Sequence, residues 1–149
     1  MTKIALITTT VHVPVVLEQY GRIAPDVDIY IAGDLKTPHQ QVVNIGQEIS
    51  NNVYYLTPEN QVGLAPVLSS MIGWNTIQRR NLALLAALRS GADLIFSVDD
   101  DIWPLKDDFF DRLLQSFHGR AFQCVTTNGF INPGADARPS PYVYRGFPY

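Results

Sequence analysis

The chain has 149 residues and a formal net charge of −3, from 11 Lys and Arg against 14 Asp and Glu, so it suits one domain without overall attraction for nucleic acid or anionic lipid. Hydrophobic residues make up 46% of the sequence and charged residues 17%, which excludes the composition of a disordered chain. Because Cys124 is the only cysteine and no stretch approaches the roughly 20 apolar residues of a membrane span, a disulfide scaffold and a membrane protein are excluded, and a cytoplasmic location is expected.

The first third of the chain predicts strands that alternate with helices. Apolar and β-branched residues from Lys3 to Thr10 predict a strand. A helix over 15–23 is expected next, since Pro14 is tolerated in a first helical turn. The apolar run 27–32 predicts a second strand, which ends at the turn dipeptide Gly33-Asp34.

The middle of the chain is less regular. Residues 39–52 are ambiguous, with a short helix as one interpretation, and 53–56 predict a short strand. The stretch 57–73 contains two prolines and two glycines and receives no firm assignment.

The segment 76–90 carries the strongest helical signal. Gly91 follows it as a C-terminal stop, and Asn81 falls within its apolar face. That face is formed by apolar residues at i, i+7, i+8 and i+11, which are Ile77, Leu84, Leu85 and Leu88.

The last elements again alternate. Residues 94–98 form a continuous apolar run typical of a central parallel strand covered on both faces. An amphipathic helix over 109–117, stopped by Gly119, and a strand over 122–126 are expected after it. This alternation predicts an α/β, Rossmann-like fold with a mostly parallel sheet, flanking helices and a ligand crevice beyond the carboxyl ends of the strands.

Three consecutive aspartates follow the apolar run 94–98, and they are the main candidate for a metal site. In an extended chain residues i and i+2 point to the same side, so Asp99 and Asp101 would converge on one cation while Asp100 points away. Carboxylate oxygens favour Mg²⁺ or Mn²⁺, and such an ion keeps positions open for the phosphates of a nucleotide, near which Asp99 and Asp100 are expected. The alternative is a solvated acidic turn that caps the next helix.

The ends of the first two strands carry further candidates. Thr8, Thr9 and Thr10 offer hydroxyl and backbone groups to a base, although ordinary β-branched strand residues are an equal alternative. Asp34 and Lys36 would contact a ribose or base edge and a phosphate, or else belong to a solvated turn.

Two arginines and an asparagine lie near the start of the helix predicted over 76–90. Arg79 and Arg80 would grip phosphate at the helix N-terminus, with at least one of them facing solvent as an alternative. Asn81 is a candidate nucleotide contact, or a buried amide bonded to a neighbouring strand.

Short motifs carry a resemblance to known enzymes. The combination of Gln78-Arg79-Arg80-Asn81, Gly91-Ala92-Asp93 and the run from Ile95 to Asp101 resembles GT-A type nucleotide-sugar glycosyltransferases with a D-x-D metal site. The tail from Thr127 to Tyr149, with Arg145-Gly146-Phe147-Pro148-Tyr149, is similar to the reversibly glycosylated polypeptides, or UDP-arabinopyranose mutases, where this stretch reads Arg-Gly-Tyr-Pro-Phe. The loop from Gly33 to Pro38 is also similar to STELLO-type glycosyltransferases.

The resemblance implies a function and a set of site residues. It implies a UDP-sugar-type donor, Mn²⁺ or Mg²⁺ on Asp99 and Asp101, and a nucleotide contact at Asp34. Arg145 matches the arginine that becomes glycosylated in the mutases, which makes it the catalytic candidate. A phosphate clamp or a surface arginine is the alternative for Arg145, because guanidinium is a poor nucleophile.

Glycosyl transfer to an unknown acceptor, or mutase-like self-glycosylation, is therefore the expected activity. The alternatives are a non-catalytic nucleotide-sugar-binding subunit or module, and a Mg²⁺-dependent phosphatase or nucleotidyltransferase. The sequence stops at Tyr149, where the acceptor-binding half of that family is expected to begin, so a single nucleotide-sugar-binding domain over 1–149 is expected. Aromatic residues between Tyr142 and Tyr149 would contact that missing half or a second copy in a homo-oligomer.

Overall fold

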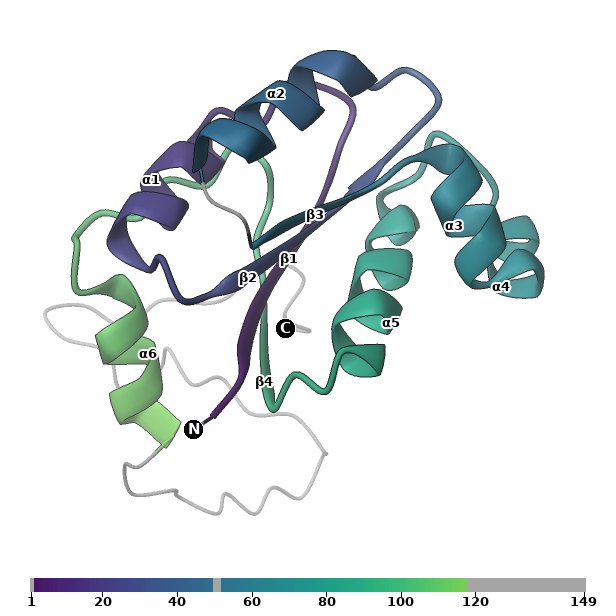
Figure 1. The fold of residues 1–149 in the computed structure, drawn as a ribbon. Coiled ribbons are helices and arrows are strands. Elements are labelled where there is room, and N and C mark those ends of the chain that lie inside the picture. Colours follow the sequence, from purple (N-terminus) through teal and green to yellow (C-terminus); the bar gives the residue numbers. More distant parts are fainter. Residues whose placement is uncertain (1, 50–51, 118–149) are drawn as a thin grey trace, which may run out of the picture. The chain divides into compact units, whose positions relative to one another are not determined.

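The computed structural model describes residues 2–49 and 52–117, which contain a four-stranded, all-parallel sheet flanked by helices (Figure 1). Its strands are β1 (Ile4–Thr10), β2 (Asp28–Gly33), β3 (Val53–Leu56) and β4 (Leu94–Ser97), in the spatial order β3-β2-β1-β4. The predicted α/β class and parallel sheet are confirmed. The chain divides into two units, Met1–Leu113 and Leu114–Tyr149, and the sheet belongs entirely to the first.

The helices connect the strands in the expected alternation. They are α1 (Val16–Ile23), α2 (His39–Ile49), α3 (Pro58–Leu64), α4 (Pro66–Ile72), the 3₁₀ turn η1 (Ile77–Arg79), α5 (Arg80–Arg89) and α6 (Phe109–Phe117). None of the helices in these ranges is long and apolar enough to cross a membrane.

The stretch 57–73, left unassigned above, forms the two short helices α3 and α4. Thr57 caps α3, because its Oγ1 accepts from the backbone N–H of Asn60 at 3.2 Å and its own N–H donates to Asn60 Oδ1 at 3.3 Å. Pro58 and Pro66 each stand in the first turn, where a missing N–H costs nothing. These prolines therefore start helices in a stretch that the sequence left without a firm assignment.

One face of the sheet carries the large apolar side chains. Leu6 of β1 and Ile29 of β2 pack there with Leu17 and Tyr20 of α1, and all four are at most 1% exposed. Phe110 of α6 joins the same cluster and meets the Tyr20 ring edge-on, with the centroids 6.1 Å apart. In Figure 1, α1 and α2 lie on this side of the sheet and α5 lies on the other.

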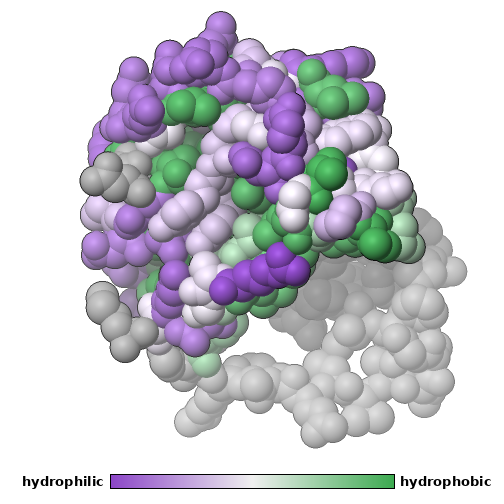
Figure 2. Space-filling model, turned by 45° about the vertical axis from the view of Figure 1, so that its right-hand side comes forward, coloured by the Kyte–Doolittle hydropathy of each residue, from purple (hydrophilic) through white to green (hydrophobic). Residues whose placement is uncertain are grey.

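The opposite face combines small residues with the larger Ile7 and Tyr30. Ala5 and Ala32 of the strands and Ala83 and Ala87 of α5 are all completely buried. Because alanine side chains are small, the backbone of α5 can lie close to β1 and β2. Figure 2 turns α3, α4 and α5 toward the viewer and shows hydrophobic side chains exposed among hydrophilic ones; Val67 and Met71 of α4 are 72% and 80% exposed.

Two expectations about packing are wrong. In the part of the chain that the structure describes, β4 pairs only with β1, and its residues Leu94, Ile95 and Phe96 are half-buried, so it is an edge strand rather than a central one. β2 is the strand that is buried throughout.

The buried face of α5 also differs from the predicted one. Leu82, Ala83 and Ala87 are fully buried, whereas Ile77 and Leu88 are 60% and 54% exposed. Ile77 lies in η1, where a 3₁₀ turn advances about 120° per residue instead of 100°, so it does not share the face predicted for a continuous helix. Within α5 the small residues Ala83 and Ala87 pack against the sheet, and Leu88 lies away from it.

Several predictions lie outside the described residues. These are the strand over 122–126, the helix stop at Gly119, and every feature of the tail, including Arg145.

Candidate functional site

A cavity of about 340 Å³ lies beyond the carboxyl ends of β1, β2 and β4. The chain order places it where the sheet changes direction, because β1 is followed by β2 on one side while β4 returns to the other side. Such a switch point is where α/β proteins bind ligands. The lining residues come from the end of β1, the loop after β2, the entry to α5 and the turn after β4: Thr9, Thr10, Val11, Asp34, Asn75, Thr76, Ile77, Arg80, Asp99, Asp100 and Asp101.

The three consecutive aspartates all line this cavity, but they form a turn rather than an extended segment. The N–H of Ile102 donates to the carbonyl of Asp99 at 3.2 Å, so Asp100 and Asp101 are the central residues of the turn. Asp100 Oδ2 accepts from Thr10 Oγ1 at 2.5 Å, across 90 residues of sequence. The prediction that Asp100 points away is therefore wrong, because it assumed the alternation of a strand.

Arg80 brings a positive charge to the cavity wall. Its Nη2 donates to Oδ1 of Asp99 in an ion pair, in which the side chains are 21% and 52% exposed. Its Nε is buried and has no hydrogen-bond partner within residues 2–49 and 52–117. Arg80 thus lines the cavity while its Nε lies buried behind the ion pair.

Asp34 is buried to 1% exposure and holds two segments of backbone together. Its Oδ1 accepts from the N–H of Leu35 at 2.6 Å, and its Oδ2 accepts from the N–H groups of Asn75 at 2.8 Å and Thr76 at 3.3 Å. Asn75 has φ of 58°, a left-handed conformation that asparagine tolerates better than most residues. Asp34 therefore fixes the corner through which the chain enters η1.

A hydroxyl links the loops after β1 and β2. Thr37 Oγ1 donates to the carbonyl of Thr10 at 2.6 Å and accepts from the N–H of Asp34 at 2.7 Å. These two hydrogen bonds hold the loops after β1 and β2 together beside the cavity.

Arg79 lies outside the cavity, in a buried polar network behind it. Its side chain is completely buried; Nε donates to Gln61 Oε1 at 2.8 Å, and Nη1 donates to the carbonyls of Ser69 and Gly73, each at 3.1 Å. The guanidinium also lies 3.7 Å from the centroid of the Trp74 ring. Burial lowers the pKa of Arg79, and the charge of Asp34 opposes that shift.

The remaining predicted residues are distributed as follows. Thr9 lines the cavity, and its Oγ1 donates to the carbonyl of Ala32 at 2.8 Å. Thr8 is completely buried, while Lys36 and Asn81 are exposed, and none of these three lines the cavity. Arg145 lies outside the described residues. The structure thus brings together seven of the predicted positions: Thr9, Thr10, Asp34, Arg80, Asp99, Asp100 and Asp101.

The sequence analysis missed four lining residues, which are Val11, Asn75, Thr76 and Ile77. Thr76 carried a signal, since a threonine at the start of the predicted helix is a common N-cap; in the structure its Oγ1 accepts from the N–H of Gln78 at 3.4 Å. Nothing in the sequence indicated that Asn75 adopts a left-handed conformation and so turns this corner toward the cavity.

The donor set allows one kind of cation site and not another. Among the residues described, no three carboxylate, histidine or cysteine side chains are gathered closely enough to hold a metal ion by themselves. The carboxylates of the acidic turn nevertheless face one cavity, and Mg²⁺ is commonly held by one or two carboxylates together with ligand phosphates. The cavity therefore fits a cation that arrives with a phosphate ligand, and does not fit one enclosed by protein alone.

Behind the cavity, Gly33 leaves room for Tyr55. A Cβ at Gly33 would lie 2.1 Å from the Tyr55 hydroxyl, which itself lies 2.5 Å from Nδ1 of His39. Desolvation raises the pKa of Tyr55 to about 12. This corner is tightly packed and holds the loop that carries Asp34.

Comparison with models of protein families and with curated protein sequences gives no match to this chain. The resemblance to nucleotide-sugar glycosyltransferases therefore depends only on the short sequence motifs quoted above.

Proposed function

We propose that this chain binds a nucleotide sugar, of the UDP-sugar type, in the cavity at the carboxyl ends of β1 and β4, and that it has the GT-A type of fold. The observation that carries the proposal is the convergence on one cavity of an acidic turn, an arginine and the entry to α5. The expected activity is transfer of the sugar to an acceptor, or mutase-like self-glycosylation.

The proposal assigns different parts of the donor to different walls. Arg80 lines the cavity and would offer its guanidinium to the diphosphate, because the planar guanidinium matches the spacing of phosphate oxygens. The hydroxyl of Thr9 and the polar corner at Asn75 and Thr76 offer contacts to the ribose or base. A volume of about 340 Å³ lies within the ordinary range of small-molecule sites, so it suits part of a nucleotide sugar.

Asp99, Asp100 and Asp101 would hold Mn²⁺ or Mg²⁺ together with the diphosphate. A cation bound there would stabilise the negative charge that develops on the departing nucleotide. The protein's own contribution is to present these carboxylates on a turn that Thr10 and the end of β4 hold in place.

Calorimetric titration of UDP and a panel of UDP-sugars, with and without Mn²⁺, tests the proposal. Asp101→Ala should abolish metal-dependent binding and leave the fold unchanged, because Asp101 is exposed at the cavity. Asp111→Ala, an exposed aspartate of α6 that does not line the cavity, is the matched control and should bind as the parent does. Equal UDP affinity in Asp101→Ala and the parent contradicts the assignment.

Product analysis separates the remaining candidates. Transfer or release of a radiolabelled sugar indicates a glycosyltransferase, whereas tight binding with neither outcome indicates a binding subunit. Release of inorganic phosphate from a phosphomonoester, or of pyrophosphate from a nucleoside triphosphate, favours the phosphatase or nucleotidyltransferase.

A further inference from the structure

We propose that Arg79 is a positioning residue for the candidate site. It lies behind the cavity and holds the segment 73–76 in the conformation that presents Asn75 and Thr76 to it. Arg79 itself does not line the cavity, so it acts through this segment and not by touching a ligand. The effect on the cavity wall is independent of what binds there, whereas the effect on UDP binding rests on the proposed function.

The backbone of this segment needs support from outside it. Gly73 has φ of 72° and Asn75 has φ of 58°, so left-handed residues stand on both sides of Trp74. In a residue other than glycine, such a conformation persists only where the surrounding structure determines it. Asp34 provides part of that support, because its carboxylate accepts from the N–H groups of Asn75 and Thr76.

Arg79 supports the other end of the segment. Its Nη1 donates to the carbonyl of Gly73 at 3.1 Å, and its guanidinium carbon lies 3.7 Å from the centroid of the Trp74 ring. The hydrogen bond and the ring contact thus act on two consecutive residues. Asp34 holds the N–H groups nearest the cavity and Arg79 holds the residues before them.

The guanidinium can hold this segment because its other donors are bonded to the fold. Nε donates to Gln61 Oε1 at 2.8 Å. Gln61 Nε2 in turn donates to the carbonyls of Gly33 at 2.7 Å and Leu56 at 2.8 Å, which end β2 and β3. Nη1 and Nη2 donate to Oγ of Ser69 in α4 at 3.0 and 3.1 Å. The chain of bonds therefore runs from the sheet to the cavity wall.

The same network attaches α3 and α4 to the domain. Each of these helices buries a single residue, Gln61 in α3 and Ser69 in α4, and both are polar and bonded to Arg79. By contrast, α1 buries apolar residues such as Val16 and Leu17. Directed hydrogen bonds from a planar guanidinium fix orientation, and an ammonium group cannot reproduce that fork.

The test is amide hydrogen exchange of the whole chain, followed by NMR, in the parent and in Arg79→Lys. Lysine keeps the charge and loses the fork, so it should release Gly73 and Trp74. Protection of the N–H groups of Asn75 and Thr76 should then fall about tenfold relative to that of the N–H groups within β2. A residue that only stabilises the whole fold would not lower this ratio, because global unfolding exposes the strand as well.

Two further variants make the ratio specific. Ile29→Val removes one buried carbon near the amino end of β2, at the other end of the strand from the cavity, and should lower protection of the strand without lowering the ratio. Ser69→Ala removes the hydroxyl that accepts from Nη1 and Nη2, and should lower the ratio by less than Arg79→Lys does. The proposal is overturned if the ratio is unchanged in Arg79→Lys or, where that variant does not fold, in Ser69→Ala.

Calorimetry with UDP and Mn²⁺ on the same variants separates this proposal from the proposed function. Where the parent binds, Arg79→Lys should bind about tenfold more weakly and Ile29→Val as the parent does, and equal affinity in Arg79→Lys and the parent counts against the positioning role. If the parent binds no UDP but the exchange ratio falls, the nucleotide-sugar proposal fails and the positioning role stands. If the parent binds UDP with Mn²⁺ but the ratio is unchanged, the proposed function stands and the positioning role fails.

Discussion

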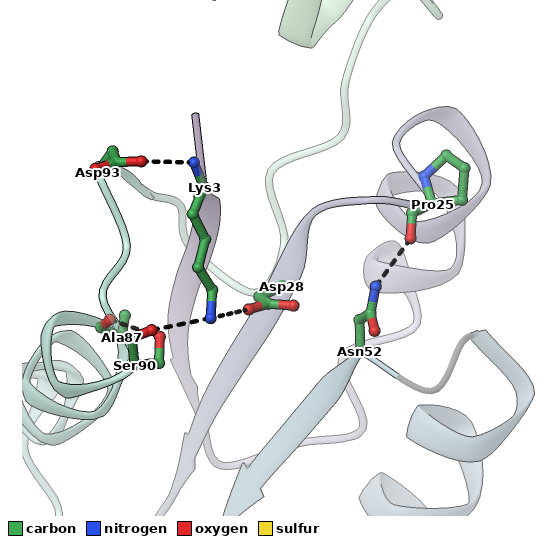
Figure 3. Close-up of polar contacts among 7 residues, drawn as sticks. All are labelled: Lys3, Pro25, Asp28, Asn52, Ala87, Ser90 and Asp93. Atoms are coloured by element: carbon green, nitrogen blue, oxygen red, sulfur yellow. Dashed lines mark hydrogen bonds and ion pairs between the residues drawn. The ribbon is translucent and has the colours of Figure 1, made fainter. Parts of the chain in front are cut away.

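The two ends of the parallel sheet use charged side chains in different ways. At the amino end, Lys3 donates from Nζ to the carbonyl of Ser90 at 3.0 Å, pairs with Asp28 at 3.2 Å, and donates from its backbone N–H to Asp93 at 2.7 Å (Figure 3). Its hydrogen bond with Asp28 raises the pKa of Lys3. At the carboxyl end, four carboxylates and one arginine line a cavity.

The difference lies in how fully the charges are paired. At the amino end, each carboxylate that meets Lys3 receives a donor, and the bonds join β1, β2 and the turn before β4. At the carboxyl end, the carboxylates that line the cavity outnumber the one arginine there, and it is this excess of acid on which the proposed cation-dependent site depends.

The largest expected effect concerns the buried network behind the cavity. Arg79→Met removes the donors to Gln61, Ser69 and Gly73 and leaves the Oε1 of the fully buried Gln61 without its donor. The free energy of unfolding should fall by about 3 kcal/mol in urea titrations. Arg89→Met, at an exposed arginine of α5, is the control and should change it little. A loss below about 1 kcal/mol for Arg79→Met would mean that the network stabilises the carboxyl end far less than its burial indicates.

Substitutions at the two ends of the sheet should differ in whether they change stability or binding, and this difference tests the comparison directly. Asp28→Asn removes the partner of Lys3, so stability should fall measurably, by less than in Arg79→Met, while nucleotide binding stays as in the parent.

The combined change Asp99→Asn, Asp100→Asn and Asp101→Asn should abolish metal-dependent binding and leave the free energy of unfolding unchanged or higher, since it relieves like-charge repulsion. Urea unfolding and calorimetry on the same preparations measure both properties. A large loss of stability in the triple variant would show that the acidic turn is structural, as Asp28 is.

The smallest effect is expected at alkaline pH. The pKa of Tyr55 is raised to about 12 in the folded chain, whereas an unfolded tyrosine titrates near about 10. Its contribution to stability is therefore present below pH of about 10 and is lost as the pH rises toward about 12. Tyr55→Phe should flatten the decline of stability in this window, measured by urea unfolding at several pH values. Tyr54→Phe, at a tyrosine that is 43% exposed, is the control, and equal slopes for the two variants would count against the role of burial.

Much of the fold follows from local patterns. The strand over 3–10, the helix over 15–23 and the helix over 109–117 are observed within a residue or so of their expected bounds. These segments have apolar residues at a clear period of 2 or 3.6, and that periodicity is a local property. The acidic turn was found for the same reason, because a polar run directly after an apolar strand is visible in the sequence alone.

The site was less predictable because its geometry depends on neighbours that are distant in sequence. Two adjacent arginines lie in different surroundings. Arg79 is hydrogen-bonded to Gln61 and Ser69 in the buried network, whereas Arg80 lines the cavity. Arg79 is the last residue of η1 and Arg80 the first of α5, and which of the two meets buried partners depends on residues that lie elsewhere in the sequence.

The sequence by itself determined the alternation of strands and helices and the presence of acid at the end of β4, since each depends on residues close together in the chain, and the alternation in turn predicted a parallel sheet. Only the tertiary structure decided that Asp100 meets Thr10, that Arg80 meets Asp99 and that Asp34 holds the corner at Asn75. These contacts join residues 90, 19 and 41 positions apart, and such pairs are set by how the sheet brings strand ends together rather than by local preference.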